Sequence, residues 1–164
     1  LTFDPVRQDN LAFAGGFNQG TGASRVYAVL HSRTQLTYSL IINSASNGMS
    51  AYKGFLGNAN KPTVYQNSIS MTHSTAFTGA HMFSWRVGTP SDFGVTVDNT
   101  AEETASNATF VAGTWTTVGT TVVGFEPDMD LAEIIICDSA AGPAVSAAEQ
   151  TQLLAYFSAR YGIW

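Results

Sequence analysis

The sequence is short of charge and of long apolar runs, and each shortage excludes a class of protein. Charged residues make up 12% of the 164 residues, about half the share found in an average soluble domain. With two lysines, five arginines and a net charge of −5, the chain has no basic stripe, which argues against nucleic acid and against an anionic membrane surface as partners. No apolar run approaches the ~18 residues needed to cross a bilayer.

Cysteine is equally scarce. The single cysteine, Cys137, excludes a disulfide within the chain, and its place in an isoleucine-rich run predicts a packed, unreactive thiol. The histidines His31, His73 and His81 are widely separated and lack the spacing of a metal site. We therefore expect no metal or other cofactor.

The length suits one domain with a core of its own, so we expect a single domain over residues 1–164. The chain opens at Leu1 without a methionine, and no amino-terminal segment reads as a signal peptide. We expect the domain to be a fragment of a longer polypeptide.

The sequence is rich in short runs of Val, Ile, Thr and aromatic residues bounded by turn residues, which predicts many short strands. The expected strands are two stubs within Leu1–Phe17, then Arg25–His31, Thr37–Asn43, Met49–Leu56, Thr63–Met71, Ala80–Val87, Phe93–Val97, Phe110–Val111, Trp115–Phe125 and Leu131–Asp138. No helical period appears among them, so the pattern predicts an antiparallel β-sandwich.

Some pairings and faces can also be predicted. We expect Arg25–His31 and Thr37–Asn43 to form a hairpin, Thr63–Met71 to be an edge strand, and Thr100–Thr109 to be a polar loop. Alternation places two apolar sets in the core: Phe83, Trp85 and Val87, and Phe93, Val95 and Val97. Trp115 is assigned to the core as well. Asn99, in a predicted tight turn, tolerates a positive φ.

The last third of the chain carries the clearest pattern. Three consecutive isoleucines in Leu131–Asp138 predict a central strand covered on both faces. Ser146 and Glu149 have the spacing of a capping box, and Gly162 follows as a helix stop. Between these ends, one apolar stripe at helical spacing must dock on the rest of the domain; it consists of Leu153, Leu154, Phe157 and Tyr161.

This closing segment resembles that of bacterial and phage laminin-G-like, concanavalin-A-like jelly-roll domains. The matching stretches are Ala132–Asp138, the Ser-x-x-Glu of Ser146–Glu149, and Tyr156–Gly162. Near the amino terminus, Phe3, Asp4, Asp9 and Leu11 match the same family, with Pro5 where glycine is usual. The resemblance implies an all-β, two-sheet jelly roll with one short carboxy-terminal α-helix, a fold that carries lectins, enzymes and structural modules alike.

Catalytic residues are not expected. Glu126, Asp128 and Asp130 alternate as the carboxylates of a jelly-roll glucanase would, but Pro127 does not fit the middle of a sheet and the third acid is Asp. A polysaccharide-cleaving enzyme is the less favoured alternative. The resemblance also leaves a calcium ion at the sandwich rim open, with Asp98, Asn99, Asp128 and Asp130 as oxygen ligands of the right type.

For ligand binding, we expect an aromatic plane against a sugar ring and polar side chains on its hydroxyls. The candidate residues are Arg86, Ser84, Tyr52, Tyr65, Asn47 and Asn99. The interpretation is a non-enzymatic adhesion module of a phage virion protein, such as a tail fibre, a receptor-binding protein or a capsid-surface appendage, which binds host glycans.

The alternative is a structural or decoration domain that packs in the particle without a soluble ligand. The expected partners are a surface glycan or other virion subunits, with a homo-oligomer as one option. The expected location is the virion surface, and the alternative location is a secreted protein or the bacterial cell surface.

Overall fold

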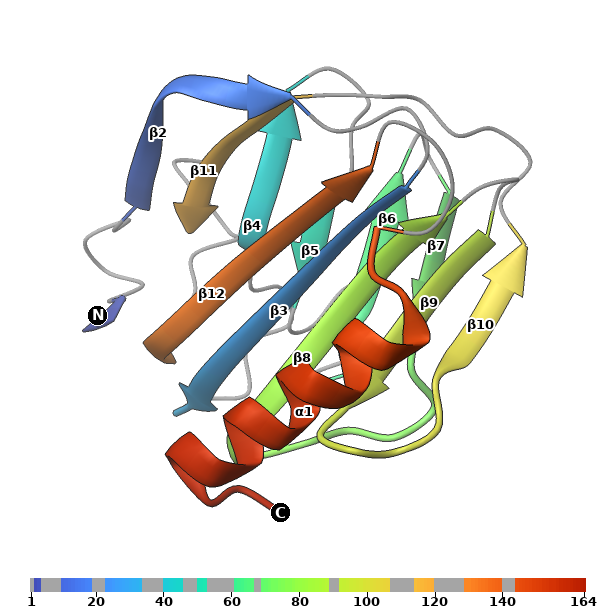
Figure 1. Ribbon diagram of the computed structural model, residues 1–164. Helices are drawn as coiled ribbons and strands as arrows, with labels where there is room; N and C mark the ends of the chain where they lie inside the picture. Colours follow the sequence, from blue (N-terminus) through green and yellow to red (C-terminus); the bar gives the residue numbers. More distant parts are fainter. Residues whose placement is uncertain are drawn as a thin grey trace.

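In a computed structural model, the chain forms two antiparallel β-sheets packed face to face, with one helix on the outside (Figure 1). The structure describes residues 2–3, 10–18, 23–33, 40–45, 50–52, 61–66, 69–88, 92–106, 114–119, 129–139 and 144–164. Within these ranges, each sheet has six strands. The architecture confirms the predicted fold class, an all-β two-sheet sandwich closed by a carboxy-terminal α-helix.

Sheet A contains, in spatial order, β1 (Thr2–Phe3), β12 (Met129–Ser139), β3 (Ala23–Ser32), β8 (Gly79–Gly88), β9 (Asp92–Val97) and β10 (Glu103–Ser106). Sheet B contains, in spatial order, β2 (Asn10–Asn18), β11 (Thr114–Gly119), β4 (Leu40–Ala45), β5 (Ser50–Tyr52), β6 (Thr63–Gln66) and β7 (Ile69–Thr72). The helix α1 spans Ala147–Tyr161. No helix in the described part of the chain has the length and apolar character needed to cross a bilayer.

The main core lies between the two sheets, where alternate residues of each strand face inward. Sheet A contributes both predicted apolar sets, and the ring planes of Phe83 and Trp85 stack with centroids 5.7 Å apart. Sheet B contributes Ile41, Ile42, Val64, Met71 and Val118. Trp85 is fully buried, as predicted, whereas the Trp115 side chain lies outside the described residues.

A second apolar cluster covers the opposite face of sheet A. Phe157 of α1 is fully buried there against Tyr27, Val29 and Met82. Figure 1 shows α1 running along β3 and β8 on the side away from sheet B. All residues from 23 to 30 of β3 are buried: the inner ones meet sheet B, and on the outer face Tyr27 and Val29 meet the helix.

β12 confirms the prediction of a strand covered on both faces. Ile134 and Ile136 pack against the main core, while Ile135 and Cys137 pack against the helix cluster. The strand pairs with β3 along its length and, in the described part of the chain, with the two-residue β1 at Met129 and Asp130, before the predicted stretch Leu131–Asp138. Cys137 is packed as expected, although it is only partly buried.

The predicted hairpin between Arg25–His31 and Thr37–Asn43 is wrong. The corresponding strands, β3 and β4, belong to different sheets: β3 pairs with β12 and β8, and β4 pairs with β11 and β5. Both strands are apolar and both face the core, so alternation alone could not tell a hairpin from a crossing between sheets.

Three further expectations are corrected. The predicted single strand Thr63–Met71 is two antiparallel strands, β6 and β7, in which Gln66 pairs with Ile69. The edge position predicted for this stretch belongs to β7. Thr100–Thr109 contains β10, which pairs with β9. The positive φ of the β9–β10 turn is at Asp98 (φ 53°), not at Asn99, and the Asp98 Oδ1 atom accepts from the Met82 N–H at 2.9 Å.

The ends of α1 are those that the sequence predicts. Ser146 is the N-cap: its Oγ accepts from the Glu149 N–H at 3.3 Å, and its own N–H donates to the Glu149 carboxylate at 2.9 Å. Gly162 ends the helix in the left-handed conformation (φ 61°) and donates to the Ser158 carbonyl at 2.9 Å. Hydrogen bonds to the Glu149 carboxylate from the Ser146 hydroxyl (2.6 Å) and from the Ser146 N–H lower the pKa of Glu149.

Replacing Ser146 by alanine should destabilise the domain by about 1 kcal/mol, because the Glu149 N–H loses its acceptor at the helix end. Chemical denaturation followed by circular dichroism measures the change. Ser146→Thr keeps a hydroxyl at the cap and serves as the control. Equal stability of the Ala and Thr variants would show that the cap does not stabilise the docked helix.

Candidate functional site

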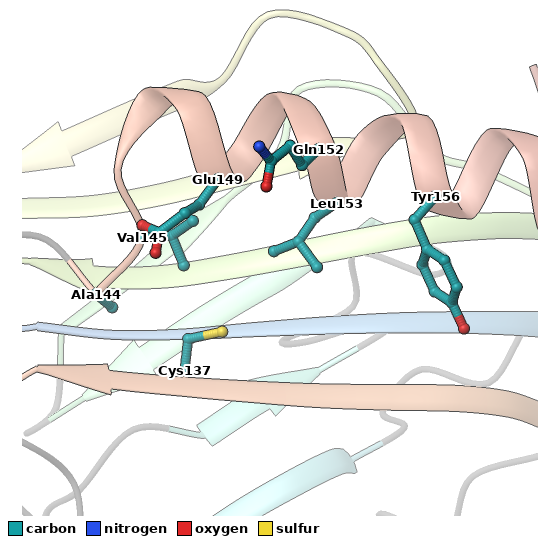
Figure 2. Close-up of a pocket in the computed structure, with 7 residues that line it drawn as sticks. All are labelled: Cys137, Ala144, Val145, Glu149, Gln152, Leu153 and Tyr156. Atoms are coloured by element: carbon teal, nitrogen blue, oxygen red, sulfur yellow. The ribbon is translucent and has the colours of Figure 1, made fainter.

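A groove opens on the outer side of sheet A, between α1 and the carboxy-terminal half of β12. Its volume is about 400 Å³, within the size range of small-ligand sites. Seven residues line it: Cys137, Ala144, Val145, Glu149, Gln152, Leu153 and Tyr156. Figure 2 shows the Cys137 thiol rising from β12 beneath the helix, with Leu153 and Tyr156 pointing down towards the strands.

The helix sequence builds one wall of this groove. Glu149, Gln152 and Tyr156 follow one another at spacings of three and four residues, which places them along one flank of α1. Leu153 lies on the neighbouring apolar stripe and supplies the inner part of the wall. The groove therefore has an apolar floor and a polar rim.

The strand side of the groove depends on a bulge in β12. Leu131 pairs with Leu30 and Glu133 pairs with Val29, so Ala132 is an extra residue without a partner. The insertion turns Leu131 into the main core and Glu133 to the helix side. From Glu133 onward, alternate residues of β12 face α1.

Glu133 fixes the aromatic edge of the groove. Its carboxylate accepts from the Tyr156 hydroxyl at 2.9 Å and 3.0 Å and from the Tyr161 hydroxyl at 2.6 Å. The Arg160 guanidinium lies 3.5 Å from the same carboxylate and over both tyrosine rings, 5.9 Å and 5.5 Å from their centroids. The Tyr156 ring is thus held in place although 39% of the residue is exposed.

Desolvation and the Glu133 carboxylate raise the pKa of Tyr156 and Tyr161, while Arg160 lowers it by a smaller amount. Both hydroxyls therefore remain protonated at neutral pH, where they act as donors to Glu133. The tyrosine at the groove edge is a neutral, amphipathic surface.

A second hollow of about 320 Å³ lies beyond this cluster, near the carboxy-terminal end of α1. Its lining residues are Val29, Leu30, His31, Ala80, Asp130, Leu131, Ala132, Tyr161 and Ile163. Hydrogen bonds from Thr2 (2.7 Å) and Arg33 (2.6 Å) lower the pKa of Asp130. The Asp130 carboxylate is therefore occupied by the protein's own donors.

A partly buried ionic cluster lies on the outer face of sheet A, beginning at Arg25, which is the register partner of Cys137. Arg25 and Arg86 both pair with the Glu102 carboxylate, and Arg86 makes the pair through Nε (3.2 Å) and Nη2 (2.8 Å). Arg25 also donates to the Ser84 hydroxyl at 3.3 Å. The Glu102 carboxylate lies against Gly94, where an added Cβ would come within 2.5 Å of Cδ, so any side chain at this position would displace the carboxylate from the two arginines.

Among the sequence-predicted site residues, Ser84 and Arg86 are brought together in this cluster. Ser84 is 1% exposed, so it is part of the packed interior. Tyr65 lies on β6 in the other sheet, and Asn99 is exposed in the turn after β9. Tyr52 ends β5, with its side chain outside the described residues, and Asn47 lies outside them entirely.

Sequence reasoning missed the groove residues Glu149, Gln152 and Tyr156 as a candidate site. A helical wheel could have found Tyr156, because this aromatic residue lies beside the buried stripe rather than within it. Glu133 could not have been found in this way, since its orientation depends on the bulge.

Within the described ranges, no group of three or more His, Cys, Asp and Glu residues could hold a metal ion. Of the residues considered for calcium, Asp98 contacts the His81 Nδ1 atom at 2.8 Å and the Met82 N–H. Asp130 is held by Thr2 and Arg33, and Asn99 is exposed. Asp128 and Glu126 lie outside the described residues.

The fold has known structural relatives, although the sequence has none that identify a family. No protein-family model matches the sequence, and no curated protein matches it significantly. The structure described under cell entry of botulinum neurotoxin type C, dependent on two ganglioside molecules, aligns at TM-score 0.54 and 10% identity over 84% of this chain. The binding domain of botulinum neurotoxin DC in complex with SialylT aligns at TM-score 0.59 and 9% identity over 82%.

The binding domain of botulinum neurotoxin serotype G aligns at TM-score 0.55 and 8% identity over 91% of this chain. These alignments cover 36%, 35% and 40% of the neurotoxin chains, so the domain spans little more than a third of each. At such low identity the likeness establishes a shared β-sandwich fold. The second and third of these structures are described as binding domains.

Replacing Glu102 by glutamine should destabilise the domain by about 3 kcal/mol, because Arg25 and Arg86 would be left buried without a counter-charge. Urea denaturation at neutral pH gives the difference. Glu103→Gln changes the neighbouring, more exposed carboxylate and should cost less than about 1 kcal/mol. Similar losses in the two variants would contradict a special role for the buried cluster.

Proposed function

We propose that the protein is a non-enzymatic glycan-binding module, and that its glycan lies in the groove between α1 and β12. The observation that carries the proposal is Tyr156, an exposed aromatic ring fixed at the edge of a groove with an apolar floor. The apolar face of a pyranose packs on such a ring, and its hydroxyls need nearby polar groups. Glu149 and Gln152 provide a carboxylate and an amide on the same rim.

Immobilisation of the Tyr156 ring supports this choice. A side chain that is already held loses little conformational entropy when a ligand packs on it. Tyr156 is held by two hydrogen bonds to Glu133 and by the Arg160 guanidinium. The fold likeness gives further support, since cell entry of one neurotoxin is described as dependent on interaction with two ganglioside molecules and the binding domain of another is described in complex with SialylT.

Tyr156→Ala should weaken glycan binding about tenfold, because the ring that packs on the sugar is removed. The binding glycan is first identified on an array and its affinity is then measured by calorimetry. Tyr156→Phe keeps the ring and should retain most of the binding. Tyr65→Ala is the matched control on sheet B and tests one of the sequence-predicted candidates.

Binding that survives Tyr156→Ala but is lost in folded Tyr65→Ala would place the site on sheet B and contradict the groove. Circular dichroism on each variant separates lost binding from lost folding. Chromatography of the bound glycan after long incubation tests whether the module is non-enzymatic, because cleavage of the glycan would show an enzyme.

We also propose that the parent polypeptide is a surface protein of a phage virion, such as a tail fibre or a receptor-binding protein. Low charge and a neutral Ser, Thr and Asn content support this origin. Mass spectrometry of purified particles should detect the chain. Its detection only in secreted or bacterial cell-surface fractions would favour the alternative location.

The second candidate function is a structural domain that packs in a particle without a soluble ligand. The exposed Tyr156 and the apolar groove floor would also suit burial against another subunit. Light scattering distinguishes the two, because an assembly face gives an oligomer that Tyr156→Ala dissociates, whereas a glycan-binding face stays open in a monomer.

A further inference from the structure

We infer that the groove selects neutral glycans and rejects acidic ones, and that Glu149 is the residue that makes this choice. The inference rests on the proposed function and names the ligand class of the same site. Of the seven residues that line the groove, Glu149 is the charged one. A sialic acid or uronic acid carboxylate placed there would meet a like charge at close range.

Glu149 lies at the amino-terminal end of α1, and this position bears on which ligands the groove accepts. The amino terminus of a helix normally attracts anions, because its free N–H groups and its dipole are both positive. Here the Glu149 carboxylate itself accepts from the Ser146 N–H at 2.9 Å and from the Ser146 hydroxyl at 2.6 Å. The protein's own carboxylate therefore occupies the position that a ligand anion would take.

The nearby cations are also committed to carboxylates of the protein. Arg160 lies 3.5 Å from Glu133, and this pair contributes no net charge to the rim. Arg25 and Arg86 share Glu102 and have side chains only 5% and 16% exposed. Arg25, Arg86 and Glu102 together keep one positive charge, but it is directed at Glu102, and Arg160 contacts Glu133 with 58% of its side chain exposed. Among the residues that line the groove itself, the charge is the one negative charge of Glu149.

Ionisation of Glu149 supports the same conclusion. The hydrogen bonds from the Ser146 side chain and backbone lower the pKa of Glu149. The carboxylate is therefore charged throughout the neutral range, so a change of pH within that range does not remove the repulsion.

Glu149→Gln removes the charge and preserves the helix end, because glutamine also serves in the third position of a capping box. Glu103→Gln is the control: it makes the same change in net charge on β10, the edge strand of sheet A, where Glu103 contacts Ser74 and His73. A difference between the two variants therefore reports local charge at the groove rather than net charge.

The test is an array printed with matched neutral and sialylated forms of the same glycans, followed by calorimetry on the best pair. Wild-type protein should prefer the neutral member, and Glu149→Gln should reduce that preference about three- to tenfold, while Glu103→Gln leaves it unchanged. Sodium chloride at about 0.5 M should also reduce it, because salt screens exposed charges.

Equal or tighter binding of the sialylated member by wild-type protein would overturn the inference and leave the glycan-binding proposal standing. A preference that Glu149→Gln does not alter would overturn the role of Glu149. Absence of binding to any glycan, neutral or acidic, would instead refute the proposed function and the inference with it.

Discussion

The whole structure depends on the burial of sheet A from both sides. β3 and β8 have sheet B against one face and α1 against the other, so their residues must be apolar, or paired, on both faces. Phe157 is the centre of the outer contact: its ring lies 5.9 Å from that of Tyr27, and burial of such a side chain stabilises the domain by roughly 1.5–3 kcal/mol. Without the docked helix, there would be neither a covered outer face nor a groove beside it.

The helix covers only part of that face, and beside it the outer side chains of sheet A form ion pairs. Arg25 and Arg86 form ion pairs with Glu102, and the Glu102 carboxylate lies against Gly94. Where the helix edge passes over β12, the Glu133 carboxylate gathers two tyrosine hydroxyls and Arg160. The groove lies between a capped helix end and this tyrosine cluster. Its aromatic edge is therefore rigid because of contacts that the fold already requires.

The sequence predicted those features that depend on local patterns. The capping box of Ser146, the glycine stop at Gly162 and the stripe that buries Phe157 each follow from spacing along one helix. The packing of β12 on both faces follows from its isoleucines. β10 was missed because a short edge strand needs few apolar residues: Ala105 packs on the core while Thr104 and Ser106 stay exposed.

The candidate site was harder to predict because it depends on contacts between distant segments. Ser84 and Arg86 were correctly placed on the face opposite Trp85, but only the fold shows that Arg25 and Glu102 occupy them. Glu133 meets Tyr156 through a bulge that pattern reading does not reveal.

The central claim is that the groove between α1 and β12 binds a glycan. Titration of ¹⁵N-labelled protein with the best array glycan, followed by two-dimensional NMR, tests it most directly. The account predicts shifts concentrated at the backbone amides of Cys137, Glu149, Gln152 and Tyr156. Shifts concentrated at Tyr65 and its neighbours on sheet B, with the amide shifts of the groove residues unchanged, would contradict it.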